Sequence, residues 1–437
     1  MKILPIVKKL FPYNYSITGS GNDIAIKQFL SFLPFKIYSF KSSREINGWK
    51  IPKAWKVIKA NLKYDDKLIY DGKNSPFGVP IHSNSFSGIV NYTELIKHIY
   101  YSKALKKAIP YNWTGLYRNN TKKSWGFCMT KEKFLNLKKG KYYVDILTRQ
   151  NNSTMKVLEY TLRGQSNRTI IINAHNCHPY QANDDISGCA VGIKIFKRLQ
   201  KLKNRKFTYK LLIAPEITGS FFWLNKQKKK ANDIKYAILL KSVGNKNKIK
   251  LQKSYKGNTN LDFFSERIIK KKIKKSRVGN FREIYGNDET VFDSPGYNIP
   301  SISITRYPFK EYHTNLDLPE ILSEKRLQEI ENYVITIIKE LEFHEKKNLK
   351  LKVNFKGLIS LSNSKYNLYL KAKAPGIDKK KYSEKNRKWN LLMNCLPNDI
   401  ENLLSIKEIA KKYKLPNKEV FNYCNKWVKK GLLKELQ

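Results

Sequence analysis

Short apolar runs alternate with segments of helical spacing through the middle of the chain. The runs are β-branched or aliphatic and are flanked by polar residues, which is typical of buried strands. They span residues 169–172, 209–214, 236–240 and 301–306. Helical spacing marks residues 188–201, 260–270 and 323–345. This repetition of strand and helix predicts an α/β fold in three layers, with a mainly parallel sheet covered by helices on both faces.

The N-terminal part of the chain has a different pattern. Asn22 or Asp23 is expected to cap the first clear helix. Residues 36–120 then alternate between apolar and polar positions and are broken by Gly and Pro turns, which is the chemistry of strands and hairpins. Residues 92–106 are expected to form a helix within this unit. We therefore predict a small β-rich domain, inserted at residues 41–124.

The last block, residues 386–437, predicts two short helices separated by a turn. Ser405 and Glu408 have the spacing of a capping box at the start of the first helix, and Asn417 starts the second. Gly431 ends the second helix, and a strand-like segment follows. This arrangement predicts a winged helix-turn-helix.

A DNA-reading role for this block is less favoured than a role as an interaction module or lid. Reading base edges requires exposed polar side chains on the second helix. Four are available, but Val420, Phe421 and Trp427 use much of the same helix for packing. The four are Lys418, Asn422, Asn425 and Lys429. Residues 346–385, which precede the block, are expected to be short strands and a basic linker.

The charge of the chain is strongly positive. Lys and Arg number 85 against 35 Asp and Glu, a formal net charge of +50. Such a charge is compatible with a nucleic-acid partner. However, the lysines are spread over nearly every segment, which favours a base-composition bias of the genome, and nucleic acid is possible but not favoured. The densest runs are interpreted as solvated faces or linkers. They are Lys226 to Lys230, Lys270 to Arg277 and Lys379 to Lys388.

Cysteine usage and hydropathy bear on the compartment. The five cysteines are an odd number and include no Cys-x-x-Cys pair, which indicates a reducing compartment without a disulfide framework. No apolar run approaches the roughly 20 residues that a membrane span needs. We expect a cytoplasmic, soluble protein, and a homo-oligomer is possible.

Candidate metal-binding or catalytic side chains are concentrated after the predicted strand at 169–172. His175, His178, Asp184 and Asp185 lie on its connection to the next helix, at the edge where open α/β sheets place their ligands. Imidazole nitrogen and carboxylate oxygen are the usual ligands of a catalytic zinc, which needs about three of them. The alternative is a capped helix start, in which Asp184 or Asp185 accepts from free backbone N–H groups.

Three further polar residues lie near later strands. Glu216 follows the strand at 209–214, Asp288 lies in the segment that leads into the strand at 301–306, and His313 follows that strand. If the strands are parallel, Glu216 shares the edge with His178. Taken alone, His313 is more simply interpreted as a surface loop residue.

The chain contains seven short motifs whose order along the sequence is also found in a known group of proteins. They are Phe11-Pro12 with Gly19 and Gly21, Trp49 to Trp55, Trp125 to Cys128, Cys177 to Pro179, Ala182 to Asp184, Pro215-Glu216 with Gly219-Ser220, and Tyr312 to Thr314. The order resembles the zinc aminopeptidase and glutaminyl-cyclase superfamily. More closely, the whole chain is similar to a bacterial group of aminopeptidase-like proteins of uncharacterised function. That group combines such a hydrolase domain with a β-rich insertion and a C-terminal winged helix.

The resemblance implies roles for particular residues. Asp184 matches the carboxylate that bridges two zinc ions in dinuclear relatives, and His313 matches the last His ligand. The first His ligand is either His175, by its position after the strand, or His178, by the Cys-His-Pro motif, and we favour His178. Glu216 matches the general base that takes a proton from water.

Two departures from the family pattern reduce the expected metal content. Ile217 stands where a metal-binding Glu is expected, and Lys241 stands near the place of an Asp ligand. One zinc, held by His178, Asp184 and His313, is therefore favoured over two. Asp288 would orient a ligand or the substrate.

The resemblance also implies a domain plan and a function. Residues 1–40 and 125–345 form a hydrolase domain, followed by the linker and the winged helix. The implied activity is zinc-dependent, aminopeptidase-like hydrolysis of an amide bond in a peptide or an acylated amino sugar, with a link to surface-polysaccharide biosynthesis. The alternative, favoured by Ile217 and Lys241, is a catalytically degenerate fold that serves as a binding or regulatory protein through its winged helix.

Overall fold

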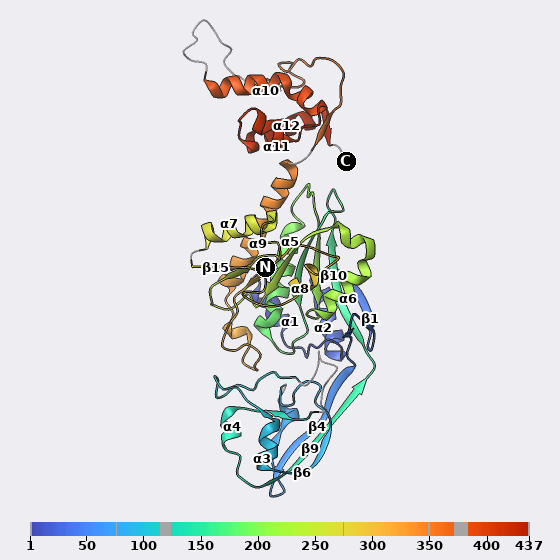
Figure 1. The fold of residues 1–437 in the computed structure, drawn as a ribbon, viewed down its shortest axis with the longest axis vertical. Coiled ribbons are helices and arrows are strands. Elements are labelled where there is room, and N and C mark those ends of the chain that lie inside the picture. The colour runs from blue at the N-terminus through green and yellow to red at the C-terminus, as the bar shows by residue number, and fades with distance from the viewer. Residues whose placement is uncertain are drawn as a thin grey trace. The chain divides into compact units, whose positions relative to one another are not determined.

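The computed structural model describes residues 2–75, 77–113, 124–273, 275–347, 350–370 and 383–435. The chain divides into two compact units, residues 1–338 and residues 339–437, whose elements are labelled in Figure 1. No helix in the described ranges is both long enough and apolar enough to span a bilayer.

The first unit contains an eight-stranded sheet in the order β1-β10-β12-β11-β13-β16-β14-β15. The four strands β12, β11, β13 and β16 are parallel to one another, and the outer pairings β1/β10, β10/β12 and β14/β16 are antiparallel. The bounds are β1 Lys36–Lys41, β10 Thr154–Leu162, β11 Thr169–His175, β12 Thr208–Ala214, β13 Ile234–Lys241, β14 Lys250–Gln252, β15 Arg277–Gly279 and β16 Ser301–Thr305. The predicted mainly parallel centre is confirmed.

Helices cover both faces of this sheet. Successive residues of a strand point to opposite faces, and β12 shows the consequence. Leu211 packs against Gly192 of α5 (Ser187–Leu199), where an added Cβ would meet the leucine. Leu212 belongs instead to the core cluster with Phe222 and Trp223 of α6 (Thr218–Gln227). The predicted three layers are therefore present, and they explain why every residue of β11 is buried.

Further helices around this sheet range in length from four residues in α8 to 24 in α9. They are α1 Leu4–Leu10, α2 Ser20–Leu30, α7 Asn260–Lys272, α8 Glu289–Phe292 and α9 Glu324–Lys347, with the turns η3 Ala182–Ile186, η4 Lys228–Asp233 and η5 Pro319–Ile321. The predicted helices at 188–201, 260–270 and 323–345 are confirmed as α5, α7 and α9.

The expected cap of α2 is wrong. The helix begins at Ser20, before Asn22, and Gly19 occupies the cap position. The Asn22 side chain accepts the backbone N–H of Ser16 at 2.8 Å and donates to its carbonyl at 2.7 Å. It therefore fixes the preceding loop. Asp23 lies in the first turn and pairs with Lys156.

A second sheet is built from the β-rich part of the chain. Its four antiparallel strands run in the order β5-β4-β9-β6. They are β4 Ala54–Tyr64, β5 Lys67–Asp71, β6 Phe86–Asn91 and β9 Lys141–Asn151, and the neighbouring short elements are β2 Glu45–Ile46, β3 Trp49–Lys50, η1 Gly72–Asn74 and α4 Lys131–Leu135. Strand β9 comes from the range assigned to the hydrolase domain, so this sheet extends past the predicted boundary at residue 124.

The helix expected at residues 92–106 is wrong. Only α3 (Tyr92–Leu95) and the turn η2 (Ile96–His98) are helical there, and β7 (Ile99–Tyr100) follows at once. Strand β7 pairs in parallel with β8 (Phe127–Cys128), and Ile99 becomes buried. Strand pairing with a distant segment thus overrides the local helical spacing, because Ile and Tyr suit a strand better than a helix.

The second unit has its own apolar core. Its elements are β17 Leu351–Val353, α10 Glu384–Glu401, α11 Ile406–Lys412, α12 Asn417–Lys429 and β18 Leu433–Glu435, and β17 pairs antiparallel with β18. The capping box of Ser405 and Glu408 is confirmed, and Val420 and Trp427 are buried as expected. The winged-helix class stays a prediction. Within the segment expected to be short strands and a basic linker, residues 348–349 and 371–382 lie outside the described residues.

Removal of the Ser405 cap tests the local folding of α11. Ser405→Ala removes the acceptor of the Glu408 N–H, and losing such a cap costs about 1 kcal/mol. We expect backbone amides of α11 to exchange hydrogen roughly fivefold faster in the full chain. Lys407→Ala, on the exposed side of the same helix, is the control. Unchanged exchange in α11 would contradict the role of the cap.

Candidate metal centre

The candidate site residues meet at the carboxyl ends of the parallel strands. His175 is the last residue of β11, Lys241 is the last of β13, and Glu216 follows the end of β12 by two residues. Asp184 lies in the kinked turn η3, and His313 lies in the loop after β16. Because parallel strands place these ends at one edge, segments more than 130 residues apart contribute to one cluster.

Three predicted ligand atoms converge. The Asp184 Oδ2 atom lies 3.0 Å from His313 Nε2 and 3.6 Å from His178 Nδ1, and all three atoms are within 4.8 Å of one another. Ligands about 2.1 Å from a tetrahedral zinc lie roughly 3.4 Å apart. All three atoms are buried, and none has a hydrogen-bond partner among the described residues. Buried polar atoms are rarely left unpaired, so this arrangement fits a metal ion.

The protonation states suit the same interpretation. Burial lowers the pKa of His178 to about 3, so its imidazole is neutral. Burial alone would raise the pKa of Asp184, but Lys241 together with the surrounding imidazoles outweighs burial and holds that pKa well below its usual range. Neutral imidazole and ionised carboxylate are the forms that bind metal.

Lys241 enters the centre of the cluster. Its Nζ donates to Asp184 Oδ1 at 3.1 Å and to Glu216 Oε1 at 3.0 Å, and it also contacts His175 Nε2. The residue is fully buried. Burial alone would lower the pKa of Lys241, but the two carboxylates raise it well above its ordinary value, so the ammonium is charged.

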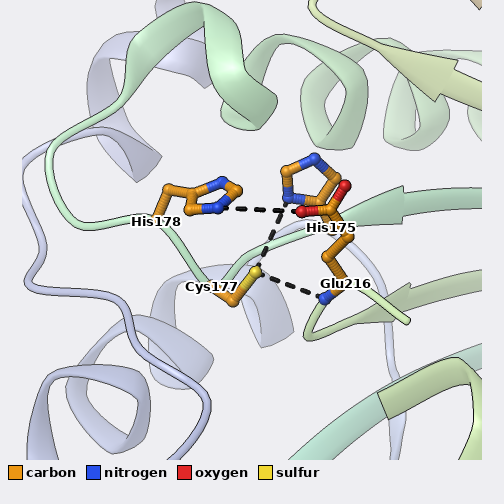
Figure 2. A group of neighbouring side chains, drawn as sticks. All are labelled: His175, Cys177, His178 and Glu216. Atoms are coloured by element: carbon orange, nitrogen blue, oxygen red, sulfur yellow. Dashed lines mark hydrogen bonds and ion pairs between the residues drawn. The ribbon is translucent and has the colours of Figure 1, made fainter. Parts of the chain in front are cut away.

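Glu216 faces the proposed ligands with its free oxygen. Figure 2 shows His178 and Glu216 turned toward each other, with Glu216 Oε2 lying 3.7 Å from His178 Nε2. Although burial would raise the pKa of Glu216, its electrostatic interactions with Lys241, His175 and His178 together lower it to about 2. The carboxylate is therefore ionised and lies beside the metal candidates.

Both ring nitrogens of His175 already have a neighbouring side chain. Its Nε2 contacts Lys241, and its Nδ1 lies 3.8 Å from Cys177 Sγ (Figure 2). Geometry alone would also let His175, Cys177, His178 and Glu216 hold an ion. However, burial raises the pKa of the Cys177 thiol well above its ordinary value, and its sulfur accepts the Glu216 N–H at 3.2 Å. The geometry favours His178 over His175 as the ligand.

The turn that carries Asp184 is held by two other carboxylates. Asp317 accepts the N–H of Asn183 at 2.7 Å and that of Asp184 at 3.0 Å. Asp185 accepts the N–H of His175 at 3.2 Å and that of Ser242 at 2.9 Å. Helix α5 has no side-chain cap, so the alternative interpretation of Asp184 and Asp185 as helix caps is wrong.

Asp288 lies behind Glu216. Its Oδ1 accepts the N–H of Ile217 at 3.0 Å, while its Oδ2 is buried without a partner in the described part of the chain. Burial, and then the charge of Glu216, raises the pKa of Asp288 to about 7. The Ile217 side chain packs against the core cluster of α6, so no carboxylate replaces the missing Glu at this position.

Three aromatic residues line the site, and only one of them, Tyr312, belongs to a motif of the sequence. Tyr111, from the β-rich part, donates its N–H to the His313 carbonyl at 2.8 Å, and its ring lies 5.5 Å from that of His178. Trp113 lies edge-on to the His313 ring, and Tyr312 stacks on it at 3.9 Å. Only Tyr312 had a signal in the sequence, its adjacency to His313. No local pattern connects Tyr111 with a residue 202 positions away.

Known proteins share this architecture. The crystal structure of a zinc aminopeptidase from Bacillus subtilis superposes with a TM-score of 0.58, at 14% identity, over 78% of this chain and 94% of that one. The fold is thus that of the zinc aminopeptidases. Residues 4–344 match the family described as a domain of unknown function (DUF4910), and the chain belongs to that family.

Two relatives from Clostridium acetobutylicum are more similar. One is 31% identical over 324 residues, which is 72% of each chain, and its name combines polysaccharide biosynthesis with an aminopeptidase-like domain. The other is a crystal structure titled as a peptidase, with 25% identity and a TM-score of 0.74 over 99% of this chain and 96% of that one. The described fold is therefore peptidase-like, and the alignment with that structure includes the second unit.

Substitution of Asp317 tests how the ligand turn is held. Asp317→Asn replaces one acceptor by an NH₂ group that faces a backbone N–H, so Asp184 loses its fixed position. Residues that orient metal ligands typically contribute 10- to 100-fold in affinity. We expect zinc affinity, measured by competition with a chelator, to fall by that factor. Asp293→Asn, a carboxylate that accepts the Ser301 N–H outside the cluster, should leave it unchanged. Equal affinities for wild type and Asp317→Asn would contradict this role.

Proposed function

We propose that this protein is a zinc-dependent hydrolase of an amide bond. His178, Asp184 and His313 hold one zinc ion, and Glu216 is the general base. The observation that carries the proposal is the convergence of three buried ligand atoms that make no hydrogen bond among the described residues, with an ionised carboxylate facing the other nitrogen of His178. When bound, zinc supplies Lewis acidity toward a carbonyl and makes a nearby water more acidic.

In this proposal, side chains of the protein transfer the proton and position the base. Glu216 Oε2 takes a proton from the attacking water, and the Lys241 ammonium holds Oε1 so that Oε2 stays directed toward His178. Asp288 holds the Ile217 N–H and with it the start of α6, which fixes the backbone next to Glu216. The proton on Glu216 then passes to the leaving nitrogen, so that the amine departs uncharged.

A cavity beside the cluster is suited to the substrate. It has a volume of about 470 Å³ and reaches His178 and Tyr111 from the side of the β-rich sheet. Trp55 and His82, also in its lining, offer aromatic surface. This volume lies in the usual range of small-molecule sites. It suits a short peptide or an acylated amino sugar, and the name of the Clostridium relative supports a substrate in polysaccharide biosynthesis.

One observation favours a different function. Lys241 and Ile217 occupy positions where dinuclear relatives are expected to carry carboxylates, which supports a degenerate fold that binds a partner. The polar residues Lys418, Asn422 and Lys429 are exposed on α12 and are available to such a partner. Salt-sensitive binding to mixed DNA, without amidase activity, would select this alternative.

Substitution of the base tests the hydrolase directly. In Glu216→Gln the amide cannot accept the proton, and general-base help is worth roughly 10²- to 10⁴-fold. We expect turnover on a panel of aminoacyl amides and N-acetylated amino sugars to fall by that factor, while circular dichroism and zinc content stay unchanged. Glu331→Gln, a buried carboxylate paired with Arg198, is the matched control. Unchanged turnover in Glu216→Gln would remove Glu216 from the chemistry.

Removal of a ligand tests the metal site. His178→Ala and His313→Ala each take away one of three ligands, so zinc measured by elemental analysis after dialysis should fall from about one ion per chain toward zero. His98→Ala, which removes an imidazole that stacks on Trp125, should retain the metal. The assignment is refuted if the two ligand variants keep the zinc content of wild type.

A further inference from the structure

We infer that the Lys241 ammonium fills one of two cation positions around Asp184, which limits the centre to one metal ion. The inference rests on the proposed metal site. It assigns a role to a residue that sequence reasoning treated only as a missing ligand. It also assigns His175 to the lysine and not to the metal.

The environment of Lys241 resembles that of a bound ion. Three polar atoms surround its Nζ, namely Asp184 Oδ1 at 3.1 Å, Glu216 Oε1 at 3.0 Å and His175 Nε2. An imidazole nitrogen and two carboxylate oxygens are a typical ligand set for a divalent metal. An ammonium has three N–H donors and no acceptor, which is one donor for each of these atoms when the proton of His175 is on Nδ1.

Asp184 separates the two positions. Its Oδ1 faces Lys241, while its Oδ2 faces His178 and His313 and has no hydrogen bond. A second ion on the Oδ1 side would have to take the place of the ammonium or lie beside it. At separations near 4 Å in a buried site, repulsion between like charges amounts to several kcal/mol. The lysine therefore excludes a metal from that side and leaves the Oδ2 side available.

The lysine also accounts for the orientation of Glu216. Because Oε1 is held at 3.0 Å by the ammonium, Oε2 is the oxygen left to face His178 Nε2, at 3.7 Å. Lys241 is thus a positioning residue for the proposed base. The ring of Tyr285, whose centroid lies 4.9 Å from Nζ, covers the ammonium from a further side.

Metal stoichiometry of a charge-reversal variant tests the inference. Lys241→Asp removes the cation and supplies a third ligand beside His175 Nε2 and Asp184 Oδ1. We expect this variant, saturated with zinc and dialysed, to hold one ion more per chain than wild type by elemental analysis. Lys235→Asp, on the same strand but six residues away, controls for the change in net charge and should hold no extra ion.

Substitution of His175 provides a second test that does not need Lys241→Asp to fold. Since His175 contacts the lysine, His175→Ala should keep the wild-type zinc content, in contrast to His178→Ala. The role of Lys241 is overturned by an equal stoichiometry in Lys241→Asp and wild type, or by loss of zinc in His175→Ala. If the wild-type protein binds no zinc, the proposed function is contradicted instead. The difference of one ion between Lys241→Asp and wild type would still test whether Lys241 occupies a cation position.

Discussion

The Asp184 carboxylate is the group on which the arrangement of the site depends. It is completely buried, and an isolated buried carboxylate costs several kcal/mol. One of its oxygens is compensated by the Lys241 ammonium, and the other is directed at two imidazoles that lack any other partner. Among the described residues, a cation thus contacts only one of the two oxygens of this carboxylate. A metal ion at His178 and His313 would contact the other.

The fold places the charged and ligating residues around Asp184. Four parallel strands end at one edge, and each of β11, β12 and β13 delivers a charged or ligating residue at or just after its last position. Asp317 and Asp185 fix the turn around Asp184 through backbone N–H groups. Tyr111, from the segment that follows β7, completes the wall beside His178 and His313. A rigid edge of this kind is the usual support for a precisely placed site.

Much of the first unit could be predicted from the sequence because its central strands are buried over nearly their whole length and therefore contain long apolar runs. The ends of those runs indicate His178, Asp184 and Glu216 as candidate site residues, whereas His313, taken alone an ordinary loop residue, is a candidate only through the family resemblance. The failures have a common physical cause. The helix expected at 92–106 is replaced by a strand that pairs with residue 127, and Asn22 bonds to Ser16 in place of capping α2. The position of the Lys241 ammonium among three acceptors likewise depends on contacts between distant segments, which no local pattern records.

The most direct test of the account is anomalous X-ray diffraction at the zinc edge from crystals of the wild-type protein grown with zinc. The account predicts a single peak in the cluster, about 2.0–2.2 Å from His178 Nδ1, Asp184 Oδ2 and His313 Nε2, with Lys241 Nζ still beside Asp184 Oδ1. A peak between His175 and Asp184 Oδ1 with the lysine displaced, or no peak near Asp184, would contradict it.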